Sequence, residues 1–473
     1  AGAVPLTWKA GKDGPHGWVP ARAIQGVATV KYRLLAENIP ALAGGPPTAL
    51  RVDGDAVSAV GGAMLVSPQV KGDYRIALKW DVSAMGRGAE GVSSWGDGDV
   101  TRPAGPVGRL EDAVYMAGHL GHDTDGAFSA VWAEGQPPFD PRPPMKWTAA
   151  LHRKMSAYFH DKTEPPYRVF MRFNPMNAGG GAALTHSFII TYGKGVTGEN
   201  FKSILGHEMT HTWTANDTLG NWYTEGDAVY YQALIPWRSG LIDTDQYLED
   251  LNATAYRYFT NALRSLPERE VAPRFWEDTR IRVLPYDRGA MYFAVLNGKV
   301  RRASGGKRGI DDLVLIMIDK ARKGEPTTEQ VWVDLLAKEI GPGGPAAHRN
   351  MMSGGLVLPE SDDFGPCFQR VTKKMRRFDL GFDNASITAN PKVIKGLKPD
   401  SEAARAGLKD GDVVTYAVAL DAVQGDLDRK LELKVTRDGK TFPLAYLPRG
   451  EAVDAYQWER KPGAPDDASC KVF

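Results

Sequence analysis

The stretch GHEMTHTW, residues 206–213, decides how the rest of this chain is interpreted. It places two histidines four positions apart, and residues four apart lie on the same face of a helix. His207 and His211 can therefore present their imidazoles side by side to one Zn²⁺ ion. Glu208 lies one position further round the helix, where it can reach a water molecule on the metal without ligating the ion. The spacing predicts a zinc centre built on a helix.

A third ligand is expected in NWYTEGDAVYYQ, residues 221–232. Glu225 begins a second helical pattern, far enough along for the chain to turn and run back beside the first helix. Two histidines and one glutamate leave the fourth position of zinc open, as in catalytic rather than structural sites. The alternative is a carboxylate that stabilises a helix start through the helix dipole, without any metal.

The composition indicates a multidomain globular protein. Its 473 residues are 42% hydrophobic and 24% charged, which suits roughly three domains of about 150 residues each. The 58 Lys and Arg residues nearly balance the 57 Asp and Glu residues, so the net charge is +1. This balance argues against nucleic acid or an anionic membrane as the partner and favours a small or peptide-like substrate. No run of about 18 apolar residues predicts a membrane-spanning helix.

Strand and helix patterns predict a multidomain α+β fold. Residues 1–120 contain short alternating apolar runs, such as VATVKYRLLAE (27–37) and YRIALKWDV (74–82), which predict a β-rich domain. Residues 121–360 combine strands with helices, and residues 361–473 return to strands and turns. Strands are expected at 167–173 and 187–193, and helices at 146–160, 199–216, 224–238, 244–264, 286–302, 309–322 and 327–340. The Gly and Pro residues of GPGGP (341–345) end the last helix.

Cys367 and Cys470 are the two cysteines of the chain, and they bracket its last hundred or so residues. If they pair, the chain-entropy model gives such a loop about 4 to 5 kcal/mol of stabilisation. The alternative is two unpaired thiols. The chain begins AGAV without an initiator Met, as signal-peptide cleavage after small residues would leave it. We therefore expect a periplasmic or secreted protein, in which a disulfide would persist.

The two zinc stretches resemble a known family. HEMTHTW followed by WYTEGDAVYY is similar to the gluzincin metallopeptidases. The order of parts resembles the glycyl aminopeptidase family: a β-rich N-terminal domain (1–120), a thermolysin-like zinc domain with a helical part (121–360) and a C-terminal PDZ domain (361–473). The resemblance implies a peptide or protein substrate.

The resemblance directs attention to two further stretches. LPYDRGAMYFAVL (284–296) is similar to a helix start whose tyrosine faces the zinc, which implies that Tyr286 donates a hydrogen bond to the oxyanion. GGGAALTHSF (179–188) is similar to the edge strand along which the substrate lies, which implies substrate contacts at Gly180, Gly181, Thr185 and His186. His186 is equally well explained as a structural histidine.

Thr185 departs from the family pattern. The family has a glutamate there, which is expected to bind the free α-ammonium of an aminopeptidase substrate. A neutral hydroxyl cannot supply the charge-assisted bond that an ammonium group calls for. An acidic residue from elsewhere could replace it, and Asp227 is one candidate because it lies close to Glu225 in sequence.

The C-terminal region resembles a PDZ domain through VIKGLKPDSEAARAGLKDGDVVTYAV, residues 393–418. DLGFD (379–383) is similar to the carboxylate-binding loop, which implies that Leu380, Gly381 and Phe382 receive a peptide C-terminus. The alternative is a module that packs on the catalytic domain and binds nothing.

The sequence therefore predicts a zinc peptidase. His207, His211 and Glu225 hold one Zn²⁺ ion, Glu208 is the general base and Tyr286 stabilises the oxyanion. The resemblance implies an aminopeptidase for small N-terminal residues such as Gly or Ala. Because of Thr185, an endopeptidase or a peptidase for blocked N-termini is the alternative within enzymes. A PDZ peptide-binding scaffold with a vestigial zinc site is the alternative outside them.

Overall fold

The computed structural model describes residues 2–10, 17–36, 48–163, 165–174, 178–184, 186–193, 195–216 and 218–471. The chain divides into two units, Ala1–Glu37 and Asn38–Phe473. Each unit is described by itself.

The first unit contains one β-hairpin. Strand β1 (Leu6–Lys9) pairs antiparallel with β2 (Gly17–Pro20), and the rings of Trp8 and Trp18 pack edge to face with centroids 5.4 Å apart. The strand predicted at 27–37 is wrong for its described part, because residues 27–36 are exposed and form no strand. Alternation of apolar side chains specifies a strand only where a neighbouring sheet or core covers one face.

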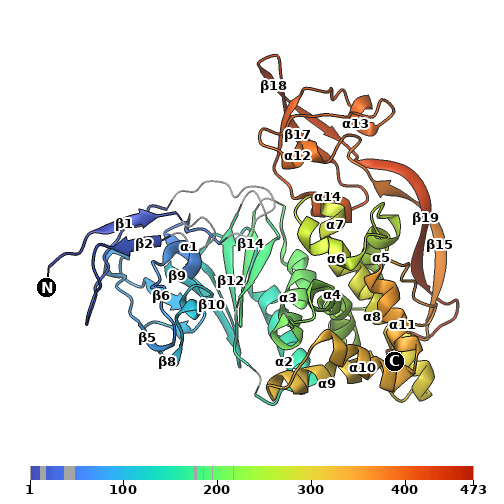
Figure 1. Cartoon of the computed structure of the whole chain (residues 1–473), viewed down its shortest axis with the longest axis horizontal. Coiled ribbons are helices and arrows are strands. Elements are labelled where there is room, and N and C mark those ends of the chain that lie inside the picture. The colour runs from blue at the N-terminus through green and yellow to red at the C-terminus, as the bar shows by residue number, and fades with distance from the viewer. Residues whose placement is uncertain are drawn as a thin grey trace. The chain divides into compact units, whose positions relative to one another are not determined.

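A mixed five-stranded sheet forms the centre of the second unit (Figure 1). Its order is β10-β11-β12-β14-β13, in which the three inner strands run parallel and the two edge strands antiparallel. The strands span Leu120–Asp125 (β10), Phe128–Ala133 (β11), Tyr167–Phe173 (β12), Gly181–Leu184 (β13) and Ser187–Tyr192 (β14). The strands predicted at 167–173 and 187–193 are confirmed as β12 and β14.

Alternate side chains of this sheet bury opposite faces, as the pleat of a strand requires. Val131, Phe170 and Ile189 pack into one core with the strands that precede the sheet. Val169 and Ile190 point the other way, into the large core shared with the helices. Because both faces are covered, the inner strands are mostly apolar, as is typical of parallel strands.

The strands before residue 120 form two further sheets, so the region is β-rich as predicted. A five-stranded sheet has the order β3-β4-β9-β6-β7, and β5 pairs with β8. Their bounds are Arg51–Asp53 (β3), Ala56–Val60 (β4), Asp73–Leu78 (β5), Glu90–Ser93 (β6), Gly96–Asp97 (β7), Val100–Pro106 (β8) and Val114–Gly118 (β9), with a short helix α1 at Gly61–Met64. The strand predicted at 74–82 is confirmed in its first part as β5.

One helix lies between β11 and β12 of the central sheet, and the others follow the sheet. They span Arg142–Tyr158 (α2), Phe201–Thr214 (α3), Asn221–Arg238 (α4), Thr244–Thr260 (α5), Glu268–Val271 (α6), Thr279–Arg282 (α7), Leu284–Ser304 (α8), Ile310–Arg322 (α9), Glu329–Ile340 (α10) and Gly343–Met352 (α11). A helix stands at each of the predicted places, and α6, α7 and α11 were not predicted. Helix α10 ends before Gly341 as predicted, but α11 begins inside GPGGP. A proline in the first turn of a helix costs no hydrogen bond, so Pro345 does not prevent α11. Among the described residues, no helix is long and apolar enough to cross a membrane.

The C-terminal region forms a small lobe on a two-stranded ribbon (Figure 1). Strand β15 (Phe368–Phe378) leads out to the lobe and β19 (Arg449–Arg460) returns beside it. The lobe has its own core and a three-stranded sheet of order β16-β17-β18. Its elements are α12 (Ala385–Thr388), α13 (Glu402–Arg405), β16 (Val413–Tyr416), α14 (Leu420–Gly425), β17 (Leu431–Arg437) and β18 (Lys440–Tyr446). The division of the chain into domains at residues 120 and 360, and the PDZ assignment, stay predictions.

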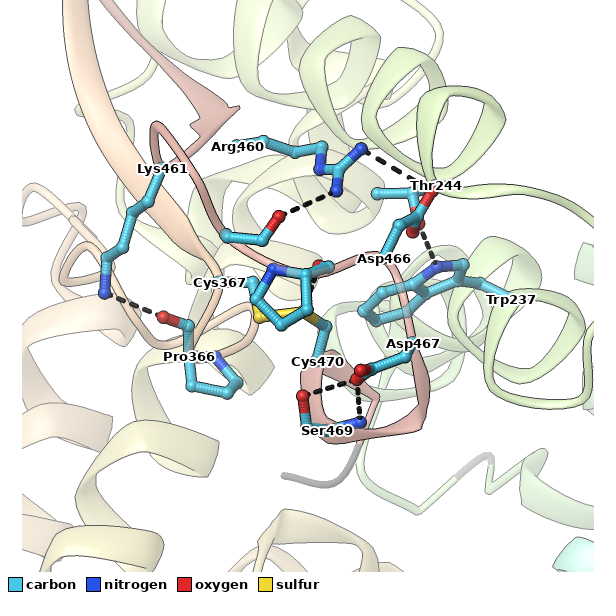
Figure 2. Close-up of a disulfide and its surroundings, with 12 residues drawn as sticks. Trp237, Thr244, Pro366, Cys367, Arg460, Lys461, Asp466, Asp467, Ser469 and Cys470 are labelled. Carbon is cyan, nitrogen blue, oxygen red and sulfur yellow. Dashed lines mark hydrogen bonds and ion pairs between the residues drawn. A yellow bond between two sulfur atoms is a disulfide. The ribbon is translucent and has the colours of Figure 1, made fainter.

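A disulfide between Cys367 and Cys470 ties the start of this ribbon to the end of the chain (Figure 2). Both cysteines are buried and belong to the main core. Thr244, at the start of α5, donates to the Asp466 carboxylate at 2.6 Å and accepts from the Trp237 indole at 3.0 Å. The C-terminal segment is therefore fastened to α4 and α5 by both covalent and polar contacts.

Removing the disulfide should destabilise the protein substantially. The bridge spans 103 residues, and closing a loop of that length is worth about 5 kcal/mol in the chain-entropy account. The double variant Cys367→Ser/Cys470→Ser should unfold at a clearly lower urea concentration than the wild type, followed by tryptophan fluorescence. Reductant should lower the wild-type midpoint and leave that of the variant unchanged. Equal midpoints for the two proteins without reductant would contradict this account.

Candidate zinc centre and substrate cleft

Helix α3 has one apolar face that packs in the core and another face that carries the two histidines. Phe201, Leu205, Met209 and Trp213 recur every four residues and are buried in the large core. His207 and His211 lie on a different face, which is turned toward α4. The core residues hold the helix in place, so the two imidazoles are fixed at neighbouring positions.

Three donor atoms meet between α3 and α4. His207 Nε2 lies 3.2 Å from His211 Nε2 and 3.2 Å from Glu225 Oε2. His211 Nε2 lies 3.6 Å from the same Glu225 oxygen. Among the described residues, this is the one group of three or more His, Cys, Asp or Glu side chains close enough to hold a metal ion.

The spacing of these atoms fits zinc. Tetrahedral Zn²⁺ bonds nitrogen and oxygen at about 2.0 to 2.2 Å, which places two ligand atoms about 3.3 to 3.5 Å apart. The three measured separations of 3.2, 3.2 and 3.6 Å lie around that value. Two imidazoles and a carboxylate are also the donor set of catalytic zinc sites, in which one position stays open. The residues predicted as ligands are therefore brought together in a geometry that suits the ion.

Close helix contacts make this geometry possible. A Cβ atom at Gly206 would lie 2.6 Å from the backbone oxygen of Gln232 in α4, and one at Gly226 would lie 2.6 Å from Gly289 Cα in α8. These glycines stand next to His207 and Glu225 in the chain. A larger side chain at either place would separate the helices that carry the donors.

The electrostatics of the ligands favour binding of a cation. Burial alone would raise the pKa of Glu225, but the hydrogen bond with His207 and the nearby His211 imidazole lower it to about 2. Burial alone would lower the pKa of His207, yet its bond to Glu225 and the nearby carboxylate charges raise it overall. The glutamate is thus anionic at neutral pH, and a zinc ion would compete with a proton for His207.

Glu208 points into the cavity in front of the donors. Burial raises its pKa, although the charges of His207 and His211 act in the opposite direction. A carboxylate with a raised pKa is a better general base, because its proton affinity is closer to that needed near neutral pH. Glu208 lines the cavity beside His207, as the sequence predicts.

Tyr286 enters the site from the first turn of α8. Its ring stacks on that of His207, with centroids 5.8 Å apart and planes inclined by 19°. Burial raises the pKa of Tyr286, and the charges of Glu225 and Glu208 raise it further. The hydroxyl therefore keeps its proton at neutral pH and can act as a hydrogen-bond donor.

A cavity of about 670 Å³ connects these groups, a size typical of small-ligand sites. Gly180 and Gly181 line it beside His207, Glu208 and Tyr286. Gly181 begins β13, which pairs with β14 on one side and forms the edge of the central sheet. The glycine-rich stretch predicted for substrate binding thus lies in the same cavity as the catalytic candidates.

Two other candidates from that stretch are not placed in the cavity. His186 is exposed, has a positive φ of 49° and accepts a bond from the Arg168 N–H through its carbonyl. It is not among the residues that line the cavity. Thr185 lies outside the described residues, so its predicted role stays a prediction.

The predicted carboxylate-binding loop lies at the base of the lobe. Leu380 and Phe382 are buried in the lobe core. The N–H of Gly381 donates to Asp379 Oδ1 at 2.8 Å, and its carbonyl accepts from the Lys398 N–H at 2.8 Å. The residues between Phe382 and Val413 are all described, and none of them belongs to a strand. Peptide binding at Leu380, Gly381 and Phe382 stays a prediction.

The sequence missed much of the cavity wall. It did not indicate Gln232, Arg257, Trp276, Arg282 or Asp421, which come from helices, a loop and the C-terminal lobe. Gln232 lies about two helical turns beyond Glu225 on the same face of α4, so helix periodicity could have found it. No sequence signal links the other four residues to the zinc motif, because they meet it only through packing between distant segments.

Fold and donor geometry together define the class of site found in zinc metallopeptidases. The M61 glycyl aminopeptidase family matches residues 214–272, which include Glu225 and the whole of α5. No curated protein matches the chain.

A solved structure shares the fold. An aminopeptidase N family protein from Idiomarina loihiensis superposes with a TM-score of 0.64 at 15% identity, over 90% of this chain and 84% of that one. A two-domain M1 zinc metallopeptidase, a mutant bound to L-arginine, gives a TM-score of 0.44 at 16% identity, over 68% of this chain and 75% of that one. The family match and the shared fold support the enzyme class predicted from the sequence, a zinc metallopeptidase.

Zinc binding should depend on pH. Zinc must displace the proton of His207, whose pKa is raised in the metal-free protein. Below that pKa the apparent zinc affinity should therefore fall by about tenfold for each pH unit, and above it the dependence should level off. Competition titrations against a chelator between pH 5 and 8.5 measure this.

The variant Glu225→Ala should lose its zinc on dialysis. Glu249→Ala serves as the control, because it removes an exposed carboxylate from α5. Metal content is read by atomic absorption. Equal zinc content in the two variants would show that Glu225 is not a ligand.

Proposed function

We propose that this protein is a zinc-dependent peptidase that removes small N-terminal residues such as Gly or Ala from peptides. The observation that carries the proposal is the triangle of donor atoms on His207, His211 and Glu225, with Glu208 and Tyr286 facing the same cavity. A site that only holds a metal has no need of a base and a hydroxyl donor in front of it.

When bound, zinc supplies Lewis acidity for a carbonyl oxygen and for water. Glu208 takes the proton of the attacking water and passes it to the leaving amine. Its position in the cavity, one residue from the ligand His207, and its raised pKa support this role. Proton transfer by a positioned carboxylate contributes about 10²- to 10⁴-fold to such reactions.

Tyr286 donates a hydrogen bond to the oxygen that becomes negatively charged as the carbonyl is attacked. Its stacking on His207 places the ring beside a ligand, and its raised pKa keeps the donor proton in place. A donor aimed at an oxyanion is worth about 3 kcal/mol in comparable sites.

The edge strand β13 holds the substrate backbone. An extended peptide can add to the free side of an edge strand through main-chain hydrogen bonds. Gly180 and Gly181 line this part of the cavity, so a bound peptide would lie against their main chain. Because the bonds are to the main chain, they position the scissile bond without specifying the substrate side chains.

We also propose that the protein works outside the cytoplasm, in the periplasm or after secretion. The disulfide between Cys367 and Cys470 supports this location, since such bonds persist in oxidising compartments.

Replacing Glu208 by Gln should abolish turnover while zinc stays bound. The substitution keeps the shape of the side chain and removes the base, so kcat should fall by at least 10²-fold. Glu249→Gln, the same change at an exposed position on α5, is the matched control. Activity is measured on a short Gly- and Ala-containing peptide and zinc by atomic absorption. Undiminished activity of Glu208→Gln would overturn the peptidase proposal and favour a peptide-binding scaffold.

Blocking the substrate amine should distinguish an aminopeptidase from an endopeptidase. The same peptide is offered with a free and with an acetylated N-terminus, each with and without a zinc chelator. We expect chelator-sensitive cleavage of the free peptide and little of the acetylated one. Equal or faster cleavage of the acetylated peptide would instead indicate an endopeptidase or an enzyme for blocked N-termini.

A further inference from the structure

The cavity in front of the zinc centre has walls from two distant parts of the chain. Gly180 lies next to β13 and Tyr286 lies in α8, whereas Asp421 and Ala422 belong to helix α14 of the C-terminal lobe. Helix α14 contacts α5 and α7, and a Cβ atom at Gly425 would lie 3.6 Å from the Arg257 side chain. The lobe is therefore part of the boundary of the substrate site.

The described residues that line the cavity include three carboxylates: Glu208, Asp287 and Asp421. Glu208 faces the reacting bond as the base. The Asp287 side chain is 1% exposed, and Arg257 donates to both of its oxygens at 2.6 to 3.1 Å. The Asp421 side chain is 41% exposed. It is thus the one accessible carboxylate of this wall that has no role in the zinc chemistry.

The bonds of Asp421 leave it able to accept another donor. Arg282 contacts Oδ2 at 2.5 Å, and the N–H of Ala422 donates to Oδ1 at 3.1 Å. Each carboxylate oxygen has two acceptor positions, so capacity remains on both oxygens. Arg282 also lies over the ring of Trp276, 5.6 Å from its centre, which fixes the guanidinium beside the carboxylate.

Asp421 lies on the same cavity as the catalytic candidates. Its ion-pair partner Arg282 stands four residues before Tyr286 in the chain, and all three side chains line the cavity. Asp421 therefore shares this cavity with the group that faces the scissile carbonyl. An α-ammonium lies one residue from the bond that an aminopeptidase cuts, so its binding site must lie close to that group.

We propose that Asp421 binds the α-ammonium of the substrate, so that the C-terminal lobe completes the aminopeptidase site. This inference rests on the proposed function. It explains how an aminopeptidase could work with a neutral threonine at position 185, because an ammonium group needs a carboxylate partner. Asp227 is not accessible to the substrate ammonium, since it is 0% exposed and already accepts a hydrogen bond from Thr214 at 2.9 Å.

The test compares Asp421→Asn with Asp428→Asn in the zinc-loaded full chain. Asp428 is an exposed carboxylate of the same lobe outside the cavity wall, so its variant is the matched control. Asp421→Asn should lower kcat/KM for the free peptide about 10- to 100-fold, mainly through KM, because a charge-assisted bond is lost. It should leave the slow cleavage of the acetylated peptide unchanged. Equal losses on both peptides would overturn the inference.

A binding measurement separates this inference from the proposed function. Calorimetry with glycine hydroxamate and N-acetylglycine hydroxamate reports the preference for a free amine without any turnover. We expect the wild type to bind the free-amine probe more tightly and Asp421→Asn to lose that preference. If Asp421→Asn keeps it, the inference fails even if the protein is a peptidase. If the wild type cleaves no peptide, the proposed function fails, and the binding ratio still decides the role of Asp421.

Arg282→Gln distinguishes ammonium binding from a purely structural ion pair. If Asp421 only fastened the lobe through Arg282, both substitutions would have the same effect. If Asp421 binds the ammonium, removing the competing guanidinium should preserve or strengthen the preference for a free amine. The same loss of preference in Arg282→Gln and Asp421→Asn would contradict the proposal.

Discussion

The candidate zinc centre depends on how closely three helices approach one another. Gly206 lets α3 lie against the backbone of α4, and Gly226 and Gly289 let α4 lie against α8. The separation of packed helices is set by the side chains at their contact. Zinc ligands must lie within a few tenths of an ångström of their bonding distance. A methyl group at any of these glycines would therefore act on the metal site through the backbone, without touching a ligand.

The same packing assigns different chemistry to neighbouring carboxylates. Glu225 is hydrogen-bonded to His207 and lies next to His211, so it stays ionised and suits a metal ligand. Glu208 is next to His207 but its pKa is raised by burial, so it suits a base. When their surroundings shift the pKa values of two carboxylates in opposite directions, the two groups can take different roles. Tyr286 completes the set, because burial keeps its hydroxyl protonated beside both of them.

The C-terminal region is anchored at both ends, and this gives its helix a defined place. Strands β15 and β19 run side by side from the large core to the lobe, and the disulfide fixes the base of the ribbon. Arg282 in α7 pairs with Asp421 in α14, which adds a contact at the far end. A segment that resembles a peptide-binding module can thus serve as a wall of the catalytic cavity.

The sequence by itself predicted the candidate zinc ligands, the candidate base and most helices of the central part. Their signals are local: an i, i+4 pair of histidines shares a helix face, and apolar residues at helical spacing predict where helices begin and end. The strand expected at 27–37 shows the limit of such signals, because alternation cannot reveal whether a partner sheet is present. Only the tertiary structure decided which residues surround the substrate. Arg257, Arg282 and Asp421 reach the cavity from separate elements, and contacts between segments far apart in the chain leave no mark on the local pattern.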